Sequence, residues 1–387
     1  MANRLILNET SYHGKGAIQN IVHEVKSRSF TKALVVTDKD LIRYNVAAKV
    51  TTLLDQAGLP YEIFDEVKAN PAVDVVKAGV EKFKQSGADY LIAIGGGSPI
   101  DTSKAIGIII NNPEFSDVLS LEGVAPTHQK CIPIIAIPTT AGTAAEVTIN
   151  YVITDEEKKR KFVCVDVHDV PAVALVDPDM MESMPKGLAA ATGMDALTHA
   201  IEGYITKAAW ELTDALHLKA IEIIGRSLRN AVNGSAEEKA KGFEGMALGQ
   251  YVAGMGFSNV GLGVVHSMAH PLSAYYDTPH GIANAVLLPY VMEFNKDYTG
   301  EKYREIARAM GVKGVDSMTQ TEYRNAAIQA VQQLSKDVGI PPKLSQIGVK
   351  EADLPALSID ALNDVCTGGN PRSCTAEELL EVYKTAF

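Results

Sequence analysis

Histidine and aspartate side chains recur at helical spacing in two segments of the chain. His266 and His270 are four residues apart and are followed by His280, and Asp195 and His199 show the same spacing well upstream. Residues four apart lie on one face of an α-helix. Two facing helices could therefore bring one carboxylate and two or three imidazoles around a metal ion. The spacing does not decide which of the three later histidines are ligands, and a hydrogen-bonded structural role competes for each one.

The donor atoms of this set are nitrogen and oxygen, with no thiolate. An aspartate and three neutral imidazoles give a divalent ion a four-ligand shell, which substrate oxygen could enter as a further ligand. Such donors suit Fe(II), Zn(II), Co(II), Mn(II) or Ni(II), and the spacing does not choose among them.

A glycine-rich segment follows a strongly apolar run. Residues 90–94 lead into Gly95, Gly96, Gly97 and Ser98, and a helical pattern follows. Glycines let backbone N–H groups approach an anion, and the start of a helix adds its positive end. This predicts a phosphate site, with a ligand-free tight turn as the alternative. The segment is not G-x-G-x-x-G and follows a later strand, so the ordinary dinucleotide fingerprint does not apply.

Two further strand ends extend the prediction to a dinucleotide. The segment 139–143 (TTAGT) follows an apolar run and offers hydroxyls at the carboxyl edge of a parallel sheet, where ligands bind. Asp38 ends an earlier run and could accept hydrogen bonds from an adenosine ribose. A carboxylate there repels a 2′-phosphate, so NAD is favoured over NADP. The alternative for Asp38 is a cap on the helical segment 39–43.

Two kinds of scaffold are needed to position these residues. Up to about residue 180, short apolar runs alternate with helical patterns, which predicts a doubly wound, mostly parallel α/β sheet. These runs cover residues 33–38, 90–94, 132–137 and 173–177, and helical segments include 45–57 and 73–86. From Ser183 onward the pattern is helical throughout, at 186–206, 210–232, 237–256, 320–337 and 375–386. We therefore predict a dinucleotide-binding α/β domain over residues 1–182 and an all-α metal and substrate domain over 183–387.

Composition excludes several classes of protein. The 387 residues carry 36 Lys and Arg against 47 Asp and Glu, a net charge of −11, which argues against nucleic acid or an anionic membrane as partner. An apolar content of 46% excludes a disordered chain. The four cysteines form no C-x-x-C pair. No apolar run approaches the length of a membrane span. We therefore expect a cytoplasmic protein.

A metal site and a dinucleotide site together predict an alcohol–aldehyde oxidoreductase. A Lewis acid would stabilise the alkoxide while hydride passes to the nicotinamide. A histidine beside the metal that is not itself a ligand would suit proton transfer.

Four motifs together resemble the iron-dependent, or group III, alcohol dehydrogenases. They are Gly95-Gly-Gly-Ser98-x-x-Asp101, Pro138-Thr-Thr-Ala-Gly-Thr143, Asp195-x-x-x-His199, and His266-x-x-x-His270 with His280. The resemblance covers nearly the whole chain. It implies a Rossmann-like domain plus a helical domain, NAD(H) and Fe(II) as cofactors with Zn(II) as a substitute, and a homodimer with the N-terminal strand segment at the subunit contact. The implied substrates are a small aldehyde and its alcohol or diol, with lactaldehyde and 1,2-propanediol as the expected pair.

The resemblance also implies a role for individual residues. It makes Asp195, His199, His266 and His280 the metal ligands, and it places His270 beside the metal as the proton relay. The implied cofactor residues are Asp38, Asn70, Gly96, Gly97, Ser98, Thr139, Thr140, Thr143, Val152 and Lys161, and the implied substrate-pocket residues are Asn150, Phe257 and Cys366. Lys161 has an alternative role, because it ends the charged run 156–161, which is typical of a solvated turn.

Three residues near the histidines depart from the family pattern. Ser267, Ser273 and Asp277 stand where glycine, glycine and asparagine are usual. None is an implied ligand, so the chemistry is expected to stand. Asp277 adds a carboxylate three residues before His280, and this carboxylate could alter metal affinity or substrate range. The competing functions are a sibling dehydrogenase for 1,3-propanediol, butanol or ethanol, an enzyme resembling 3-dehydroquinate synthase, and a metal-storage or scaffold protein. The second needs cationic residues for its substrate, and the segment 257–285 contains no Lys or Arg.

Overall fold

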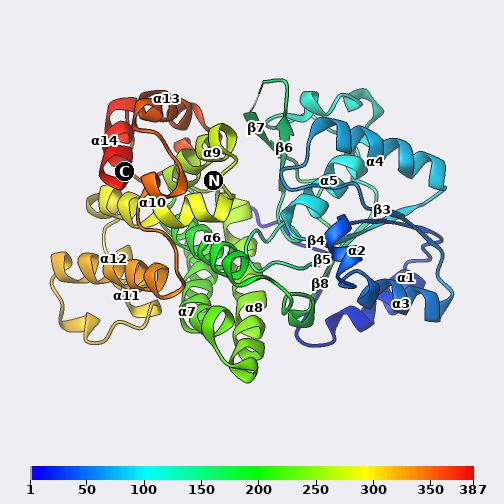
Figure 1. Cartoon of the computed structure of the whole chain (residues 1–387), viewed down its shortest axis with the longest axis horizontal. Coiled ribbons are helices and arrows are strands. Elements are labelled where there is room, and N and C mark those ends of the chain that lie inside the picture. Colours follow the sequence, from blue (N-terminus) through cyan, green and yellow to red (C-terminus); the bar gives the residue numbers. More distant parts are fainter. Residues whose placement is uncertain (1, 159) are drawn as a thin grey trace. The chain divides into compact units, whose positions relative to one another are not determined.

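A computed structural model describes residues 2–158 and 160–387 of the chain. It divides into two units, Met1–Met184 and Pro185–Phe387. The division lies two residues beyond the boundary expected from the sequence. The first unit carries the sheet, and the second is helical (Figure 1).

A six-stranded sheet, with all neighbouring strands parallel, forms the middle of the first unit. Its order is β1 (Thr10–His13), β8 (Val173–Val176), β5 (Ile134–Pro138), β4 (Tyr90–Gly95), β2 (Ala33–Val36) and β3 (Tyr61–Phe64). This arrangement confirms the α/β fold predicted from the apolar runs. The four predicted runs correspond to β2, β4, β5 and β8.

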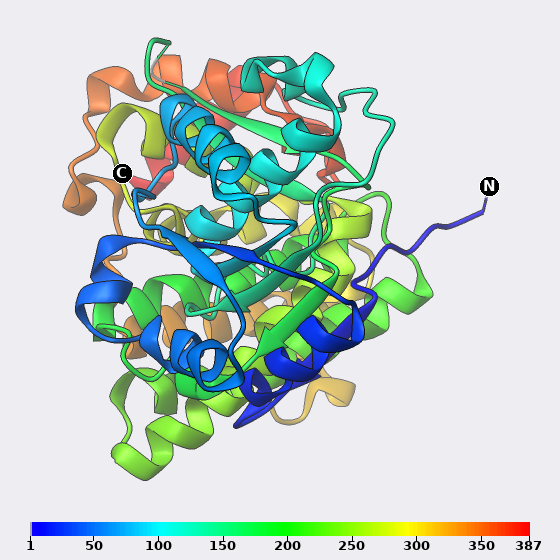
Figure 2. The same ribbon diagram turned by 90° about the vertical axis from the view of Figure 1, so that its right-hand side faces the viewer.

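Helices cover both faces of this sheet. Because side chains alternate between the faces of a strand, Leu34 and Val36 pack toward α4 (Val73–Ser86) and α5 (Gly97–Asn111), whereas Val35 packs on the opposite face. That opposite face is covered by α1 (Ile21–Ser27) and α3 (Ala48–Ala57). Figure 2 shows the two helix pairs on either side of the strands. Burial on both faces explains why these strands are apolar at every position.

Two edge strands and a hairpin were not predicted. β1 and β3 lie at the two ends of the sheet, and their side chains are mostly part-exposed, so their sequences TSYH and YEIF lack a continuous apolar run. β6 (Asn150–Asp155) and β7 (Arg160–Val165) form a separate antiparallel pair. The charged run 156–161 therefore contains a turn followed by the start of a strand. Lys159, within that run, lies outside the described residues.

The second unit consists of helices and their connections, and its described residues contain no strand. The predicted helices are present with ends within a few residues. They are α6 (Lys186–Ile205), α7 (Glu211–Asn233), α8 (Ala236–Val260), α12 (Gln320–Asp337) and α14 (Ala376–Ala386). Further helices are α9 (Val264–Tyr276), α10 (His280–Asn295), α11 (Lys302–Ala309) and α13 (Leu354–Asn363). This confirms the all-helical C-terminal region.

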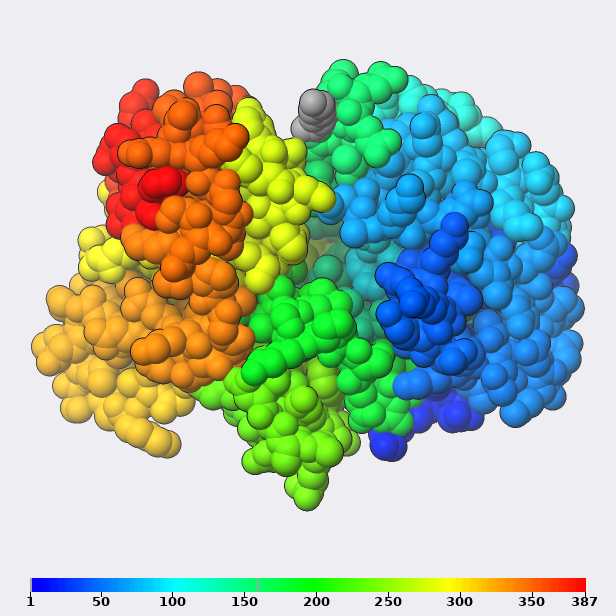
Figure 3. Space-filling model, viewed as in Figure 1, coloured from blue at the N-terminus to red at the C-terminus, as the bar shows by residue number. Residues whose placement is uncertain are grey.

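The helices that carry the histidines lie inside the second unit. α6 is buried on nearly every side, between α7, α8 and α10. α9 and α10 pack on each other, and α13 and α14 contact them from outside. In the space-filling view the orange and red surface of the C-terminal helices adjoins the yellow surface of α9 and α10 (Figure 3). A short 3-10 segment, η9 (Val365–Gly369), follows α13 and contacts α9.

All four cysteines are free thiols, as the absence of paired spacing suggested. Among the described residues, no helix combines the length and the apolar character that crossing a bilayer requires.

Candidate active site

Three helices bring the predicted metal ligands together. Asp195 and His199 lie on α6, four residues apart, and His266 lies in the first turn of α9. Their possible ligand atoms all lie within 4.8 Å of one another. His280 is the first residue of α10, and its Nε2 atom is 3.7 Å from Oδ1 of Asp195. The structure thus gathers one carboxylate and three imidazoles, the set that the spacing allowed.

A close contact between α6 and α10 places His280 beside Asp195. A Cβ atom on Gly281 would lie 2.4 Å from the carbonyl oxygen of Ala191, so a larger residue would push the two helices apart. Glycine at this position therefore lets the start of α10 approach the carboxylate on α6.

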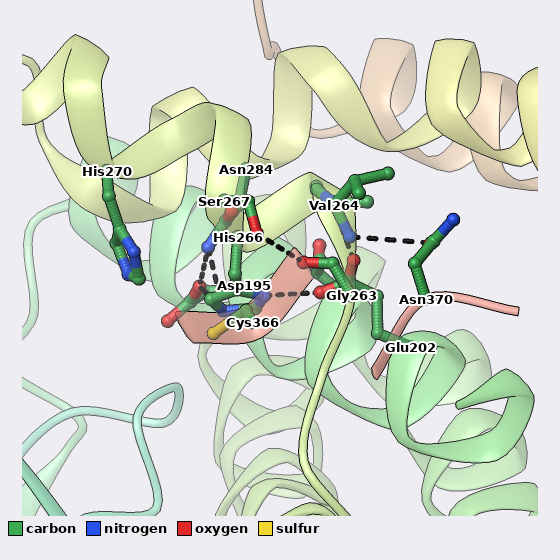
Figure 4. A network of polar contacts seen from close by, with 12 residues as sticks. Asp195, Glu202, Gly263, Val264, His266, Ser267, His270, Asn284, Cys366 and Asn370 are labelled. Atoms are coloured by element: carbon green, nitrogen blue, oxygen red, sulfur yellow. Dashed lines mark hydrogen bonds and ion pairs between the residues drawn. The ribbon is translucent and has the colours of Figure 1, made fainter. Parts of the chain in front are cut away.

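A buried carboxylate contacts the ring nitrogen of His266 that points away from Asp195. Nδ1 of His266 is 2.5 Å from Oε2 of Glu202, and the backbone N–H of Val265 donates to Oε1 at 2.7 Å (Figure 4). With Nδ1 engaged, Nε2 is the ring nitrogen that faces Asp195, at 3.9 Å from Oδ1. Carboxylates in this position fix the tautomer and orientation of metal-binding histidines.

Burial sets the charge state of this pair. It lowers the pKa of His266 well below the usual value, and neighbouring imidazoles add to the shift, so the ring is neutral and able to act as a ligand. Burial also raises the pKa of Glu202 to about 8, against the opposing effect of backbone N–H donors. A bound cation would favour the carboxylate form of Glu202.

One amide group marks the point on which three of these side chains converge. Nδ2 of Asn284 donates to Oδ1 of Asp195 at 2.7 Å, and it lies 3.1 Å from Nε2 of His266 and 3.0 Å from Nε2 of His280 (Figure 4). Three lone-pair atoms therefore face one positively polarised group. These nitrogen and oxygen atoms are ligands that suit a divalent cation such as Fe(II) or Zn(II), so the residues fit the metal implied by the sequence.

Aromatic stacking supports His199, the fourth predicted ligand. The ring of His199 stacks on Phe257 of α8, with centroids 4.2 Å apart and planes 10° from parallel, and on His266 at 4.6 Å. Phe257 was implied to line the substrate pocket, and the structure places it directly against this predicted ligand.

His270 belongs to a different group of side chains. Its Nδ1 atom is 2.7 Å from Oδ2 of Asp364, and it forms a second possible donor cluster with Asp364 and Cys366. Its ring stacks on that of His280, with centroids 5.4 Å apart, so it lies beside the first cluster without belonging to it. Burial raises the pKa of Asp364, but the charge of His270 and the hydrogen bonds from His270 and Cys366 together outweigh burial and lower the pKa to about 2.

The three departures from the family pattern have separate structural settings. The hydroxyl groups of Ser267 and Thr367 are 2.8 Å apart, which ties α9 to η9. The buried hydroxyl of Ser273 has no hydrogen-bond partner in the described part of the chain. Asp277 ends α9 in the left-handed region, with φ of 53°. Asparagine and aspartate tolerate this conformation better than most residues, which explains their exchange there.

The predicted phosphate residues meet at the carboxyl edge of the sheet. Gly96 precedes α5 and Gly97 begins it, so the loop ends at a helix N-terminus as expected. A Cβ atom on Gly96 would lie 3.0 Å from the side chain of Thr140, and one on Gly97 would lie 3.1 Å from Thr143. Glycine therefore allows the two loops to pack on each other, which brings four of the predicted cofactor residues together.

The remaining predicted cofactor residues lie around this loop pair. Asp38 follows β2 and accepts a hydrogen bond from the backbone N–H of Leu41 at 2.8 Å, so it caps α2 (Lys39–Arg43). Nζ of Lys161 donates to Oδ1 of Asn70 at 2.7 Å. Ser98 is in the first turn of α5. Thr139 directly follows β5, and its backbone N–H donates to the carbonyl oxygen of Gly95. The backbone N–H of Val152 donates to Asp101 at 3.0 Å. Asp38 thus has the capping role that competed with a ribose contact, and the two roles are compatible.

Asn150, implied to line the substrate pocket, begins β6 in the first unit. Its backbone carbonyl accepts a hydrogen bond from the buried Lys104 at 2.8 Å. Phe257 and Cys366, the other two implied pocket residues, belong to the second unit and lie near His199 and His270 respectively.

Three supporting residues were not found from the sequence. Glu202 lies three residues after His199 on α6, and Asn284 lies four residues after His280 on α10, so helical spacing from known ligands could have flagged both. Asp364 is 94 residues from His270, and no local pattern connects the two.

Family models match almost the entire chain. Residues 8–178 match the iron-containing alcohol dehydrogenase model, and residues 189–387 match the C-terminal model of the Fe-containing alcohol dehydrogenase family. The chain belongs to this family, which confirms the resemblance of its motifs. It is an oxidoreductase of small aldehydes and alcohols.

Curated relatives and solved structures match over full length. Lactaldehyde reductase of Escherichia coli K12 is 65% identical over 387 residues, covering 100% of both chains. 1,3-Propanediol dehydrogenase of Citrobacter freundii is 42% identical, covering 99% of this chain and 98% of its own. A crystal structure of 1,3-propanediol oxidoreductase superposes with a TM-score of 0.96 at 40% identity and full coverage of both chains.

Proposed function

We propose that this protein is an NAD(H)- and Fe(II)-dependent reductase that interconverts lactaldehyde and 1,2-propanediol. The observation that carries the proposal is the convergence of Asp195, His266 and His280 on the single amide of Asn284. The choice of substrate is supported by the 65% identity to a lactaldehyde reductase over the whole chain.

The metal would be held by Asp195, His199, His266 and His280. When bound, a divalent ion acts as a Lewis acid that polarises the aldehyde carbonyl or stabilises the alkoxide during hydride transfer. Burial lowers the pKa of His266 and keeps this imidazole neutral, Glu202 orients it, and Phe257 stacks on His199. Zn(II) would fit the same donors, and iron is favoured by the family.

His270 would move the proton that accompanies hydride transfer. It is beside the ligand cluster, and its Nδ1 is bonded to Asp364 rather than directed at Asp195. This leaves Nε2 as the nitrogen able to exchange a proton with substrate oxygen or water.

The dinucleotide would be bound by the sheet unit. Gly96, Gly97 and Ser98 would bind the pyrophosphate through backbone N–H groups and the N-terminus of α5. Thr139, Thr140, Thr143, Asn70, Val152 and Lys161 would contact other parts of the cofactor, and Asp38 would bind the ribose. A carboxylate at residue 38 disfavours NADP, whose extra phosphate would meet a like charge.

The substrate class separates the proposal from its nearest alternative. Phe257 and Cys366 of the helical unit would line the pocket for a small aldehyde. 1,3-Propanediol is the second candidate, favoured by the 42% identity to a dehydrogenase for that diol.

Steady-state rates of the iron-loaded enzyme under anaerobic conditions distinguish the two substrates. We expect kcat/KM with NADH to be highest for lactaldehyde among lactaldehyde, glycolaldehyde and butanal, and 1,2-propanediol to exceed 1,3-propanediol, ethanol and butanol in the reverse direction. A higher kcat/KM for 1,3-propanediol than for 1,2-propanediol would favour the second candidate.

We further infer a cytoplasmic homodimer. β1 is at one end of the sheet order, and an edge strand offers backbone groups to a second copy. Light scattering should give twice the chain mass of 41.4 kDa. A monomer mass would contradict this inference.

A further inference from the structure

Asp364 is a nearly buried carboxylate beside His270. It lies between α13 and η9, and its Oδ2 atom is 2.7 Å from Nδ1 of His270. Its Oδ1 atom accepts the backbone N–H of Cys366 at 2.8 Å. Both carboxylate oxygens are therefore engaged, one by the loop and one by the histidine.

The charge of Asp364 decides which nitrogen of His270 carries a proton. A carboxylate can only accept a hydrogen bond, so Nδ1 of His270 must be the donor. In the neutral ring the lone pair then lies on Nε2. We propose that Asp364 is a positioning residue, which holds His270 in the tautomer and orientation that let Nε2 accept and return the reaction proton. The inference rests on the relay role of His270 in the proposed function.

The segment that carries Asp364 is itself anchored at several points. The hydroxyl of Thr367 is 2.8 Å from that of Ser267, the residue after His266. Further along, Asn370 and Asn295 exchange two side-chain hydrogen bonds of 2.9 Å. The carboxylate is thus held by contacts to α9 and α10 that do not pass through His270. Such anchoring is what a group needs if it is to orient another side chain.

The competing interpretation is that the pair only fastens η9 to α9. Both interpretations predict that removing the carboxylate affects the enzyme, but they differ when His270 is absent. A positioning residue has no effect on turnover once the side chain that it positions is gone, whereas a fastening contact retains its effect. A double-mutant cycle therefore separates them.

The test compares Asp364→Asn, His270→Ala and the double variant as iron-loaded enzymes with lactaldehyde and NADH. We expect His270→Ala and Asp364→Asn each to lower kcat, the latter by roughly 10–100-fold, with iron content and the KM for NADH unchanged. In the His270→Ala background, Asp364→Asn should change kcat by less than about twofold, because a pair that acts as one unit is strongly non-additive. Asp364→Glu, which retains a carboxylate, should recover part of the turnover lost in Asp364→Asn.

Asp360→Asn is the matched control. Asp360 lies one helical turn earlier on α13 and accepts a hydrogen bond from the hydroxyl of Tyr275 at the surface. We expect wild-type kcat, whereas a loss equal to that of Asp364→Asn would assign the effect to α13 as a whole and overturn the inference.

Three outcomes contradict the inference in different ways. If Asp364→Asn turns over like wild type, or lowers kcat by the same factor with and without His270, Asp364 does not act through His270 although the proposed function stands. If Asp364→Asn fails to fold, the test uses Asp364→Glu instead. A folded Asp364→Glu enzyme without residual turnover would contradict positioning of His270 by a carboxylate. If His270→Ala itself keeps full turnover, the relay role fails and the inference fails with it.

Discussion

The two units use different kinds of group at their predicted binding sites. In the sheet unit the candidate contacts with the cofactor come from loops at strand ends. Small residues such as Gly96 and Gly97 let a phosphate approach the backbone N–H groups there. In the helical unit the candidate ligands are side chains on three helices, and further side chains hold two of them in place. Glu202 holds His266, and Phe257 stacks on His199.

This difference predicts how each site responds to substitution. A metal site built from four side chains loses a large part of its binding energy when one ligand is removed, because the remaining donors no longer complete the shell. A dinucleotide site built from many backbone contacts loses a small share with each change. Substitutions in the helical unit should therefore act on metal content, and substitutions in the sheet unit should act on cofactor affinity.

The largest effect is expected for Asp195→Ala. It removes the only carboxylate among the predicted ligands, so iron content and turnover should both fall to background. Iron analysis after anaerobic loading, together with NADH oxidation, measures both. Asp337→Ala, an exposed aspartate on α12 paired with Arg229, is the control and should keep both properties. Full iron occupancy in Asp195→Ala would remove this residue from the metal site.

Glu202→Gln should have the next largest effect. The amide keeps the size of the side chain but cannot act as a charged acceptor for Nδ1 of His266. Metal affinity should fall by roughly 10–100-fold, as is typical for partners of metal-binding histidines. Competition with a chelator of known affinity measures the change. An unchanged affinity would mean that the orientation of His266 does not depend on Glu202.

Gly97→Ala should act on the cofactor instead. Its Cβ atom would lie 3.1 Å from Thr143 and would also stand on the predicted pyrophosphate-binding face. We expect Gly97→Ala to weaken the binding free energy of NADH by about 1.4 kcal/mol, which raises the dissociation constant for NADH about tenfold. Fluorescence titration of NADH measures this constant, and iron content should not change.

Gly187→Ala is the matched control for that variant. A Cβ atom on Gly187, in the first turn of α6, meets no atom within 4 Å. NADH affinity should remain at the wild-type value. If Gly97→Ala reduced iron content as strongly as NADH affinity, the separation between the two units would be wrong.

The smallest effect is expected for Ser267→Ala. It removes the hydrogen bond to Thr367 next to a predicted ligand without removing a donor, so it should cost about 1 kcal/mol of stability. The thermal midpoint should fall by roughly 2–4 °C while iron content stays complete. Ser273→Ala is the control, since its buried hydroxyl has no partner in the described part of the chain, and its midpoint should stay the same or rise. Loss of iron in Ser267→Ala would show that this hydroxyl supports the metal site.

Central strands and long helices were predictable because burial requires apolar residues at regular positions in their sequences. β2, β4, β5 and β8 are apolar at every position, and α7 and α12 have regular apolar spacing. β1 and β3 were missed, since edge strands are part-exposed and carry mixed residues. The β6–β7 hairpin was hidden by the charged run at its turn.

The candidate ligands were predictable for a similar reason, and their partners were not. Spacing of four residues on a helix identified Asp195 with His199 and His266 with His270. It could not separate His270 from the ligands, because that depends on Asp364, which is remote in sequence. Asn284 lies four residues after His280 on α10, but spacing alone does not distinguish an asparagine that contacts the ligands from one that does not.

We propose that one divalent ion binds Asp195, His199, His266 and His280, and that His270 is not a ligand. The most direct test is a crystal structure of the protein grown anaerobically with Fe(II) and NAD, with iron located by its anomalous scattering. We expect a single iron position in each chain, bonded to those four side chains, with Nδ1 of His270 still hydrogen-bonded to Asp364. Iron bonded to His270, or placed on the Asp364 and Cys366 side of that ring, would contradict it.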